Sequence, residues 1–68
     1  MTNTTLLRNC IERSGYKLQF LADKIGISRF TLLNKIENHT EFKLSEVTKL
    51  QELLSLSNDE REEIFFGN

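Results

Sequence analysis

The sequence predicts an all-α domain, and three observations carry that prediction. Apolar residues recur at helical spacing in five segments. No segment alternates apolar and polar residues with the period of two that a half-buried strand would show. Glycine, serine and asparagine, which end or cap helices, stand between the segments. With 68 residues, no proline and no low-complexity tract, residues 1–68 are expected to form one small domain.

The elements follow in order from local signals. A first helix is expected over about residues 4–14, with Leu7, Cys10 and Ile11 on one face, and Gly15 ends it. A short second helix follows over 18–25. The third and fourth helices are expected over about 28–37 and 45–55, and the fifth begins after Ser57.

Two serines mark the starts of the later helices. Ser45 is the expected N-cap of the fourth helix, whose core positions are Val47, Leu50 and Leu54. The run SNDE, residues 57–60, is a capping box, in which a serine hydroxyl and a glutamate carboxylate each accept a backbone N–H of the first turn.

Residues 18–38, LQFLADKIGISRFTLLNKIEN, carry the strongest functional signal. Gly26 breaks an apolar helical segment at low cost, because glycine adopts positive φ freely. Ile27 anchors the turn, and Ser28 can cap the next helix, whose core stripe is Leu32 and Ile36. A short helix, a turn with glycine and a second helix are the parts of a DNA-binding helix-turn-helix.

The stretch LADKIGIS resembles the helix-turn-helix of the Cro/Xre-type regulators. The later segments NHTEFKLSEVTKLQELLSLS and EREEIFF resemble the rest of the small Cro-like proteins of phages, prophages and mobile elements in low-GC Gram-positive bacteria, so the resemblance covers about residues 6–66. It implies a five-helix lambda-repressor-like domain that binds a double-stranded DNA operator and acts as a transcriptional repressor. A two-fold homodimer is expected, because a single module makes few contacts.

The third helix is expected to read the DNA. With Leu32 and Ile36 turned inward, its outer side carries Phe30 and Asn34, flanked by Leu33 and Thr31. The expected base-contacting residues are Ser28, Arg29, Phe30, Leu33 and Asn34. Two alternatives stay open: Arg29 can contact phosphate instead of a guanine edge, and Phe30 and Leu33 can belong to the core or to a protein interface.

Phosphate contacts are expected from residues around this helix. Many relatives place a phosphate-binding glutamine at the start of the second helix, where this chain has Leu18 between Lys17 and Gln19. The second core residue of the third helix, Ile36, also lies one position later than in the common family pattern. The expected phosphate-contacting residues are Lys17, Gln19, Thr31, Lys35, Asn38, His39 and Lys43.

The charge is divided along the chain. The formal net charge is −1, but residues 1–43 hold seven lysines and arginines against four acidic residues, whereas residues 44–68 hold two against six. The half with the predicted reading helix is therefore basic, and the acidic remainder either orients the molecule on a phosphate surface or is simply a solvated helix face.

Other classes of protein find little support. Cys10 is the single cysteine and is expected to be a core thiol in a reducing compartment. His39 is not expected to bind a metal, because the chain has no second histidine and no second cysteine. Without a nucleophile motif, a Gly-rich loop or an apolar run of about 18 residues, we expect no enzyme, no cofactor, no small-molecule substrate and no membrane span, and hence a cytoplasmic protein. The alternative function is a protein-interaction module on the same fold, such as an antirepressor that binds another regulator.

The last apolar run, Ile64, Phe65 and Phe66, needs burial. We expect at least one of these phenylalanines in the core, with a dimer contact as the alternative.

Overall fold

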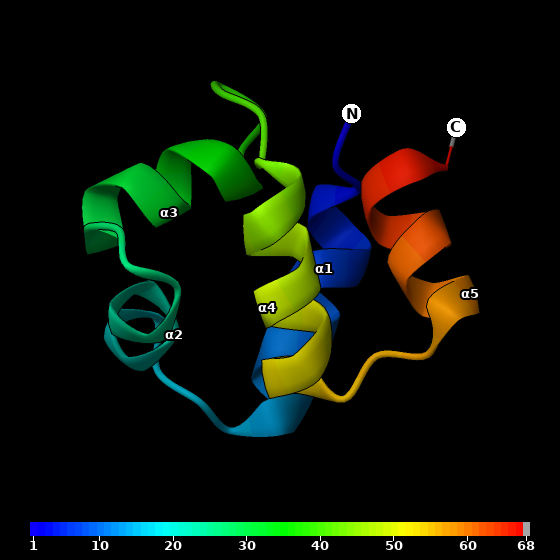
Figure 1. Ribbon diagram of the computed structural model, residues 1–68, viewed down its shortest axis with the longest axis horizontal. Coiled ribbons are helices and arrows are strands. Elements are labelled where there is room, and N and C mark those ends of the chain that lie inside the picture. Colours follow the sequence, from blue (N-terminus) through cyan, green and yellow to red (C-terminus); the bar gives the residue numbers. More distant parts are fainter. Residues whose placement is uncertain (68) are drawn as a thin grey trace.

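The computed structural model describes residues 1–67 as a bundle of short helices (Figure 1). These residues contain no strand, so the predicted all-α class is confirmed. Two predicted ranges, 4–14 and 18–25, match the observed helices. The elements are α1 (Thr4–Ser14), α2 (Leu18–Ile25), α3 (Arg29–Ile36), α4 (Leu44–Leu54), α5 (Asn58–Arg61) and a π-helical turn, η1 (Glu62–Phe66).

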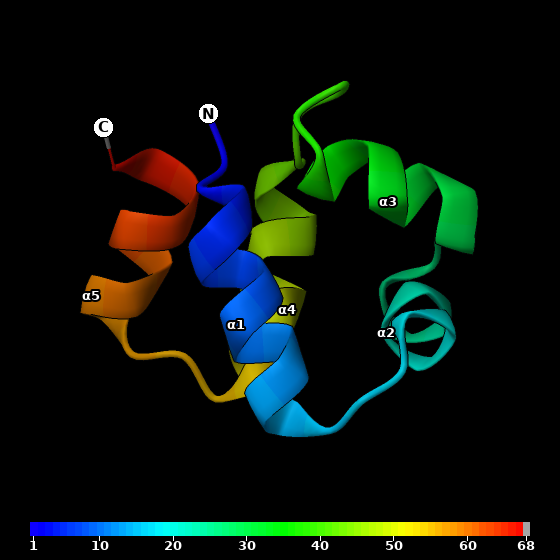
Figure 2. The ribbon, with the colours of Figure 1, turned by 180° about the vertical axis from the view of Figure 1, so that it is seen from behind.

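The helices are arranged around α1 and α4, which cross at the centre of the molecule (Figures 1 and 2). α2 and α3 lie on one side of this pair, and α5 with η1 lies on the other. The fully buried side chains come from both halves of the chain and include Leu7, Leu21, Leu32, Leu50 and Ile64. Cys10 is buried among them, as predicted, and burial raises the pKa of its thiol against the opposing charge of Arg13.

The ends of the first three helices follow the predicted signals. Gly15 and Gly26 both adopt the left-handed conformation, with φ of 76° and 84°, directly after α1 and α2. The Ser28 hydroxyl accepts the Thr31 N–H at 3.0 Å, which confirms Ser28 as the N-cap of α3. α3 itself is one residue shorter at each end than predicted.

The predicted N-cap of α4 is wrong. The helix begins at Leu44, so Ser45 lies inside the first turn and Lys43 occupies the cap position. The Glu46 carboxylate reaches back and accepts the Lys43 backbone N–H at 2.8 Å. The Glu46 N–H, which a serine cap would accept, instead bonds to the Lys43 carbonyl at 2.9 Å, so the first turn closes without a serine hydroxyl.

The C-terminal segment folds back on the core. Ser57 and Glu60 form the predicted capping box, with bonds of 3.1 Å and 2.9 Å. The chain then continues as η1 rather than as an ordinary helix, a change that the sequence did not signal. Ile64 and Phe65 are buried, and the Phe65 ring meets the Phe42 ring edge-on at 5.3 Å, so the expectation of one phenylalanine in the core is confirmed.

Candidate nucleic-acid interface

α2 and α3 form a compact unit joined by a three-residue turn, Gly26 to Ser28. The left-handed Gly26 and the backbone bond from Ile27 N–H to Ala22 O, at 3.0 Å, reverse the chain tightly. Ala22 is fully buried, and its small side chain allows α3 to approach α2 closely. The turn therefore fixes α3 at one edge of the molecule (Figure 1).

One face of α3 is buried and the opposite face is open. Leu32 and Ile36 are at most 1 % exposed, which confirms the core register assigned to this helix. Phe30, on the opposite face, is 72 % exposed, whereas Leu33 and Asn34 are half-buried at the sides of that face. An α-helix with one free face has the width to enter the major groove of DNA.

The start of α3 carries an exposed cation. Arg29 is exposed, and within residues 1–67 its guanidinium makes no ion pair. The neighbouring Ser28 hydroxyl is already used twice, since it caps the helix and donates to Thr31 Oγ at 2.9 Å. Arg29 is therefore more available than Ser28 to an acceptor on another molecule. If Ser28 contacts a base, it must use the same hydroxyl that caps α3.

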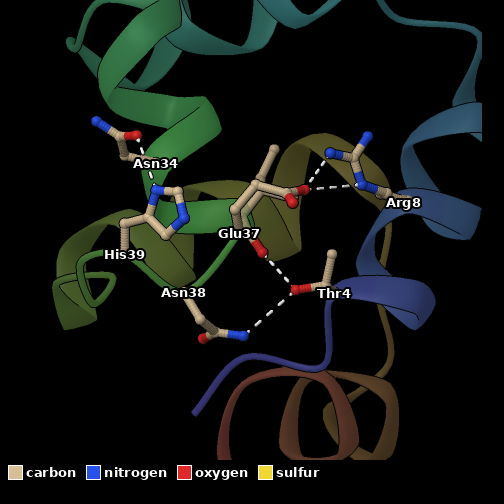
Figure 3. A network of polar contacts seen from close by, with 7 residues as sticks. Thr4, Arg8, Asn34, Glu37, Asn38 and His39 are labelled. Atoms are coloured by element: carbon tan, nitrogen blue, oxygen red, sulfur yellow. Dashed lines mark hydrogen bonds and ion pairs between the residues drawn. The ribbon is translucent and has the colours of Figure 1, made fainter.

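Asn34 is oriented by His39, which lies beyond the end of α3 (Figure 3). The distance between Asn34 Oδ1 and His39 Nδ1 is 3.3 Å, and the amide nitrogen of Asn34 points away from the ring. His39 itself is exposed. The arrangement leaves Asn34 with an amide donor directed outward at the side of the open face.

The predicted phosphate-contacting residues divide into two groups. Five of them lie at or near the surface. Thr31 is half-buried, and the exposed ones are Lys17, Gln19, His39 and Lys43. The Gln19 side chain donates to Asp23 at 2.8 Å, and the Thr31 hydroxyl accepts from Ser28. Lys35 is buried, and Asn38 is exposed but has its amide engaged within the fold.

The prediction for Lys35 is wrong. Its side chain is buried, and its ammonium donates to Glu46 Oε1 at 2.6 Å and to the Glu41 carbonyl at 3.4 Å. Burial alone would raise the pKa of Glu46, but the Lys35 bond and charge together with the Lys43 N–H hold that pKa below its usual range. Lys35 therefore joins α3 to α4 and is not available to a phosphate.

Asn38 is exposed, but its amide is engaged in hydrogen bonds to the N-terminal segment (Figure 3). Asn38 Oδ1 accepts the Thr2 N–H at 2.9 Å, and Nδ2 donates to the Thr2 carbonyl at 2.7 Å and to Thr4 Oγ at 3.3 Å. Asn38 adopts a positive φ of 65°, a conformation that asparagine tolerates better than most residues.

Two further contacts complete this connection between α1 and the end of α3. The Thr4 hydroxyl donates to the Ile36 carbonyl at 2.5 Å, and the Arg8 guanidinium pairs with the Glu37 carboxylate (Figure 3). None of these partners was predicted, since they lie about thirty positions apart in the chain. Together they fix the end of α3 and so the direction of its open face.

Sequence reasoning also missed an aromatic stack beside α2. The rings of Tyr16 and Phe20 stack at 4.8 Å, and Lys24 Nζ lies 5.5 Å from the centre of the Phe20 ring. The available signal is the spacing of Phe20 and Lys24, because residues four apart share one side of a helix, whereas Tyr16 lies just before α2. Lys24, in the last turn of α2, is exposed beside the Phe20 ring.

Other kinds of site find no support in the described part of the chain. Over residues 1–67, no three His, Cys, Asp or Glu side chains gather closely enough to hold a metal ion. The longest helices in residues 1–67 are α1 and α4, with 11 residues each. No helix in this range is long and apolar enough to cross a membrane. No protein-family model matches the chain, and no curated protein or solved structure matches it either.

Proposed function

We propose that α2, the turn and α3 act as a helix-turn-helix, and that the protein is a sequence-specific DNA-binding regulator of the Cro-like class. It would serve a phage, prophage or mobile element by occupying an operator and excluding polymerase or a competing repressor. The single observation that carries this proposal is the open face of α3, where the exposed Arg29 and the outward amide of Asn34 flank an exposed Phe30.

The side chains of this face match the edges of base pairs. Arg29 can donate two hydrogen bonds to O6 and N7 of guanine, and Asn34 can pair with adenine. Phe30 and Leu33 can pack against thymine methyl groups. Ser28, at the helix start, adds a hydroxyl close to the DNA backbone and to the first base of the site.

The surroundings of α3 suit a polyanion. Donors for phosphate oxygens surround the open face of α3, and they come from Lys17, Gln19, Thr31, His39 and Lys43. The acidic residues of α5 and η1 lie on the far side of α1 and α4 from α3 (Figures 1 and 2). This separation of charge would turn α3, and not α5, towards the DNA.

The test has two stages. Fragments of the source genome are first selected by the protein, and binding to the selected duplex is then measured over a salt series. We expect affinity to fall steeply with salt, because each neutralised phosphate releases counterions.

Arg13→Ala provides the matched control for Arg29→Ala. Arg13 carries the same charge but lies beside Glu60 of α5, at 3.5 Å, away from α3. Arg29→Ala should lose affinity for the selected duplex while Arg13→Ala keeps it. Equal losses in the two variants would mean that binding follows net charge and does not use α3.

Two observations favour a second function, a protein-interaction module such as an antirepressor. Phe30 exposes most of its ring in the centre of the reading face, and Leu18 packs against the core where a polar phosphate contact would be useful. Exposed aromatic residues are characteristic anchors of protein interfaces. Absence of duplex binding at low salt, with retained binding to another regulator, would favour this function.

A further inference from the structure

The ring of His39 lies against the amide of Asn34, at the side of the open face of α3 (Figure 3). His39 Nδ1 is 3.3 Å from Asn34 Oδ1, and the amide nitrogen, Nδ2, points away from the ring. Over residues 1–67 the ring makes no other hydrogen bond and no ion pair. The one polar contact of the ring within the described fold is therefore with a residue of the open face.

The backbone holds His39 in this place. Its N–H donates to the Asn34 carbonyl at 2.9 Å, and the Thr40 N–H donates to the same carbonyl at 3.4 Å. Just before His39, the positive φ of 65° at Asn38 turns the chain back towards α3. Because the amide of Asn38 is itself bonded to Thr2, the place of the ring is set by the fold.

The contact determines which nitrogen of the ring carries a proton. An amide oxygen accepts hydrogen bonds and cannot donate them, so His39 Nδ1 must be the donor and must be protonated. Nδ1 is protonated in the imidazolium and in one of the two neutral forms of the ring. In both forms the ring keeps Asn34 Oδ1 turned towards it, because turning the amide over would bring two donors together.

An amide held in this way presents its donor, Nδ2, to a base in front of it. In the major groove N7 of the purines, O6 of guanine and O4 of thymine accept hydrogen bonds. The edge of cytosine offers only its N4 amino group, which is a donor. Asn34 can therefore pair with adenine, guanine or thymine, but at cytosine its donor meets another donor.

A freely turning amide would lose this distinction. The two orientations of an asparagine amide have nearly the same shape and differ in the positions of the oxygen and the nitrogen. With the oxygen outward, Asn34 would accept the N4 amino group of cytosine. Over residues 1–67, the bond to His39 is the one hydrogen bond of the Asn34 amide, so this bond decides between the two orientations.

We propose that His39 is a positioning residue for base recognition: its ring fixes the amide of Asn34, so that Asn34 selects a base with an acceptor on its major-groove edge and rejects cytosine. The inference rests on the proposed DNA-binding function and names the class of base read at one position. This role differs from the phosphate contact expected of His39, because a phosphate contact strengthens binding to all sequences alike.

The proton on the ring is measured first, on the free protein. Long-range proton–nitrogen NMR correlation spectra at about pH 8, where an ordinary imidazole is neutral, show which ring nitrogen is protonated. We expect Nδ1–H in wild type and a smaller Nδ1–H fraction in Asn34→Ala, which lacks the acceptor. A wild-type His39 protonated on Nε2 would overturn the proposal, because Nδ1 would then accept and the amide would be turned over.

The base preference is measured next, on duplexes with each of the four bases at the position where Asn34→Ala loses discrimination. We expect wild type to favour guanine over cytosine there by at least about fivefold. His39→Phe keeps the shape of a ring without a donor and should lose most of this preference, as should His39→Ala. Thr40→Ala is the matched control, because its backbone bond to Asn34 remains, and it should keep the wild-type preference.

The contrary outcomes are distinct. Equal binding of guanine and cytosine by wild type, or a preference that survives in His39→Phe and His39→Ala, would overturn the proposal. So would a position for Asn34 that cannot be found because Asn34→Ala loses no discrimination, or an equal loss of preference in Thr40→Ala. Thermal melts verify that each variant is folded. Absence of all duplex binding would instead refute the DNA-binding function, and the NMR spectra would still decide how the Asn34 amide is turned.

Discussion

Replacing Lys35 with alanine should destabilise the fold strongly, although lysine-to-alanine changes on helix surfaces usually have little effect. In this chain Lys35 and Glu46 are both buried and joined at 2.6 Å. The sequence alone predicted almost no change in stability for Lys35→Ala, because Lys35 was assigned to the surface. The structure reverses that prediction, since the substitution leaves a buried carboxylate without its partner.

The expected cost follows from the burial of the pair. Removing one partner of a buried ion pair costs about 3–5 kcal/mol. At roughly 0.05–0.15 kcal/mol per residue, a chain of this size has a free energy of unfolding of about 3–10 kcal/mol. Lys35→Ala should therefore bring the domain close to its unfolding threshold at neutral pH.

The dependence on pH has a definite sign. The folded-state pKa of Glu46 lies below its unfolded value, so the pair stabilises the fold fully above the unfolded pKa and loses this effect as pH falls through the folded pKa. In Lys35→Ala the bond and charge that hold the pKa of Glu46 down most strongly are lost, and burial, which raises this pKa, is opposed only by Lys43. The gap in stability between wild type and variant should accordingly be widest near neutrality and should narrow below about pH 4.

Urea denaturation at several pH values measures these differences, and two further variants serve as controls. Lys49→Ala removes the same charge from an exposed site and should stay within about 0.5 kcal/mol of wild type. Lys35→Met with Glu46→Gln removes both charges, and the glutamine oxygen can still accept the Lys43 N–H, so this double variant should regain most of the stability. The reasoning is refuted if Lys35→Ala unfolds at the same urea concentration as Lys49→Ala.

Four more outcomes are expected. Arg29→Ala should weaken binding to the selected operator by about 1–3 kcal/mol and relax preference at one base position, as titrations against single-base variants of the duplex would show. Lys43→Ala should weaken specific and non-specific duplexes equally and lower the salt slope by about one; a loss confined to the operator would contradict a backbone role. Ile36→Ala should cost about 2–5 kcal/mol in chemical denaturation, because Ile36 is 1 % exposed. Phe65→Ala should cost about 3–5 kcal/mol, and an unchanged melt would mean that η1 is not part of the cooperative unit.

The parts of the structure that depend on near neighbours in sequence were predictable. Helical periodicity gave the inward register of Leu32 and Ile36, and the Ser57 capping box involves residues only three apart. The left-handed conformation of Gly26 likewise follows from its own lack of a side chain.

The errors concern residues whose partners lie far away in sequence. Lys35 occupies the flank of α3 next to its core stripe, and whether it reaches water depends on Glu46, which lies on another helix. Asn38 looked available for a phosphate because Thr2, its partner, is 36 positions away. The Glu46 carboxylate that holds Lys35 also accepts the Lys43 N–H at the start of α4. The buried lysine and the start of α4 at Leu44 therefore both involve this one side chain, whose two partners the sequence did not reveal.

The contacts of Thr2 and Asn3 have a consequence for the order of folding. Thr2 is held by Asn38 at the end of α3, and the next residue, Asn3, donates its N–H to the Ile64 carbonyl of η1 at 2.6 Å. These hydrogen bonds join positions far apart in the sequence, and such contacts form late because the chain between them must first close into a loop. The turn between α2 and α3 can form from near neighbours, but the end of α3 reaches its final direction only after α1 has docked against it.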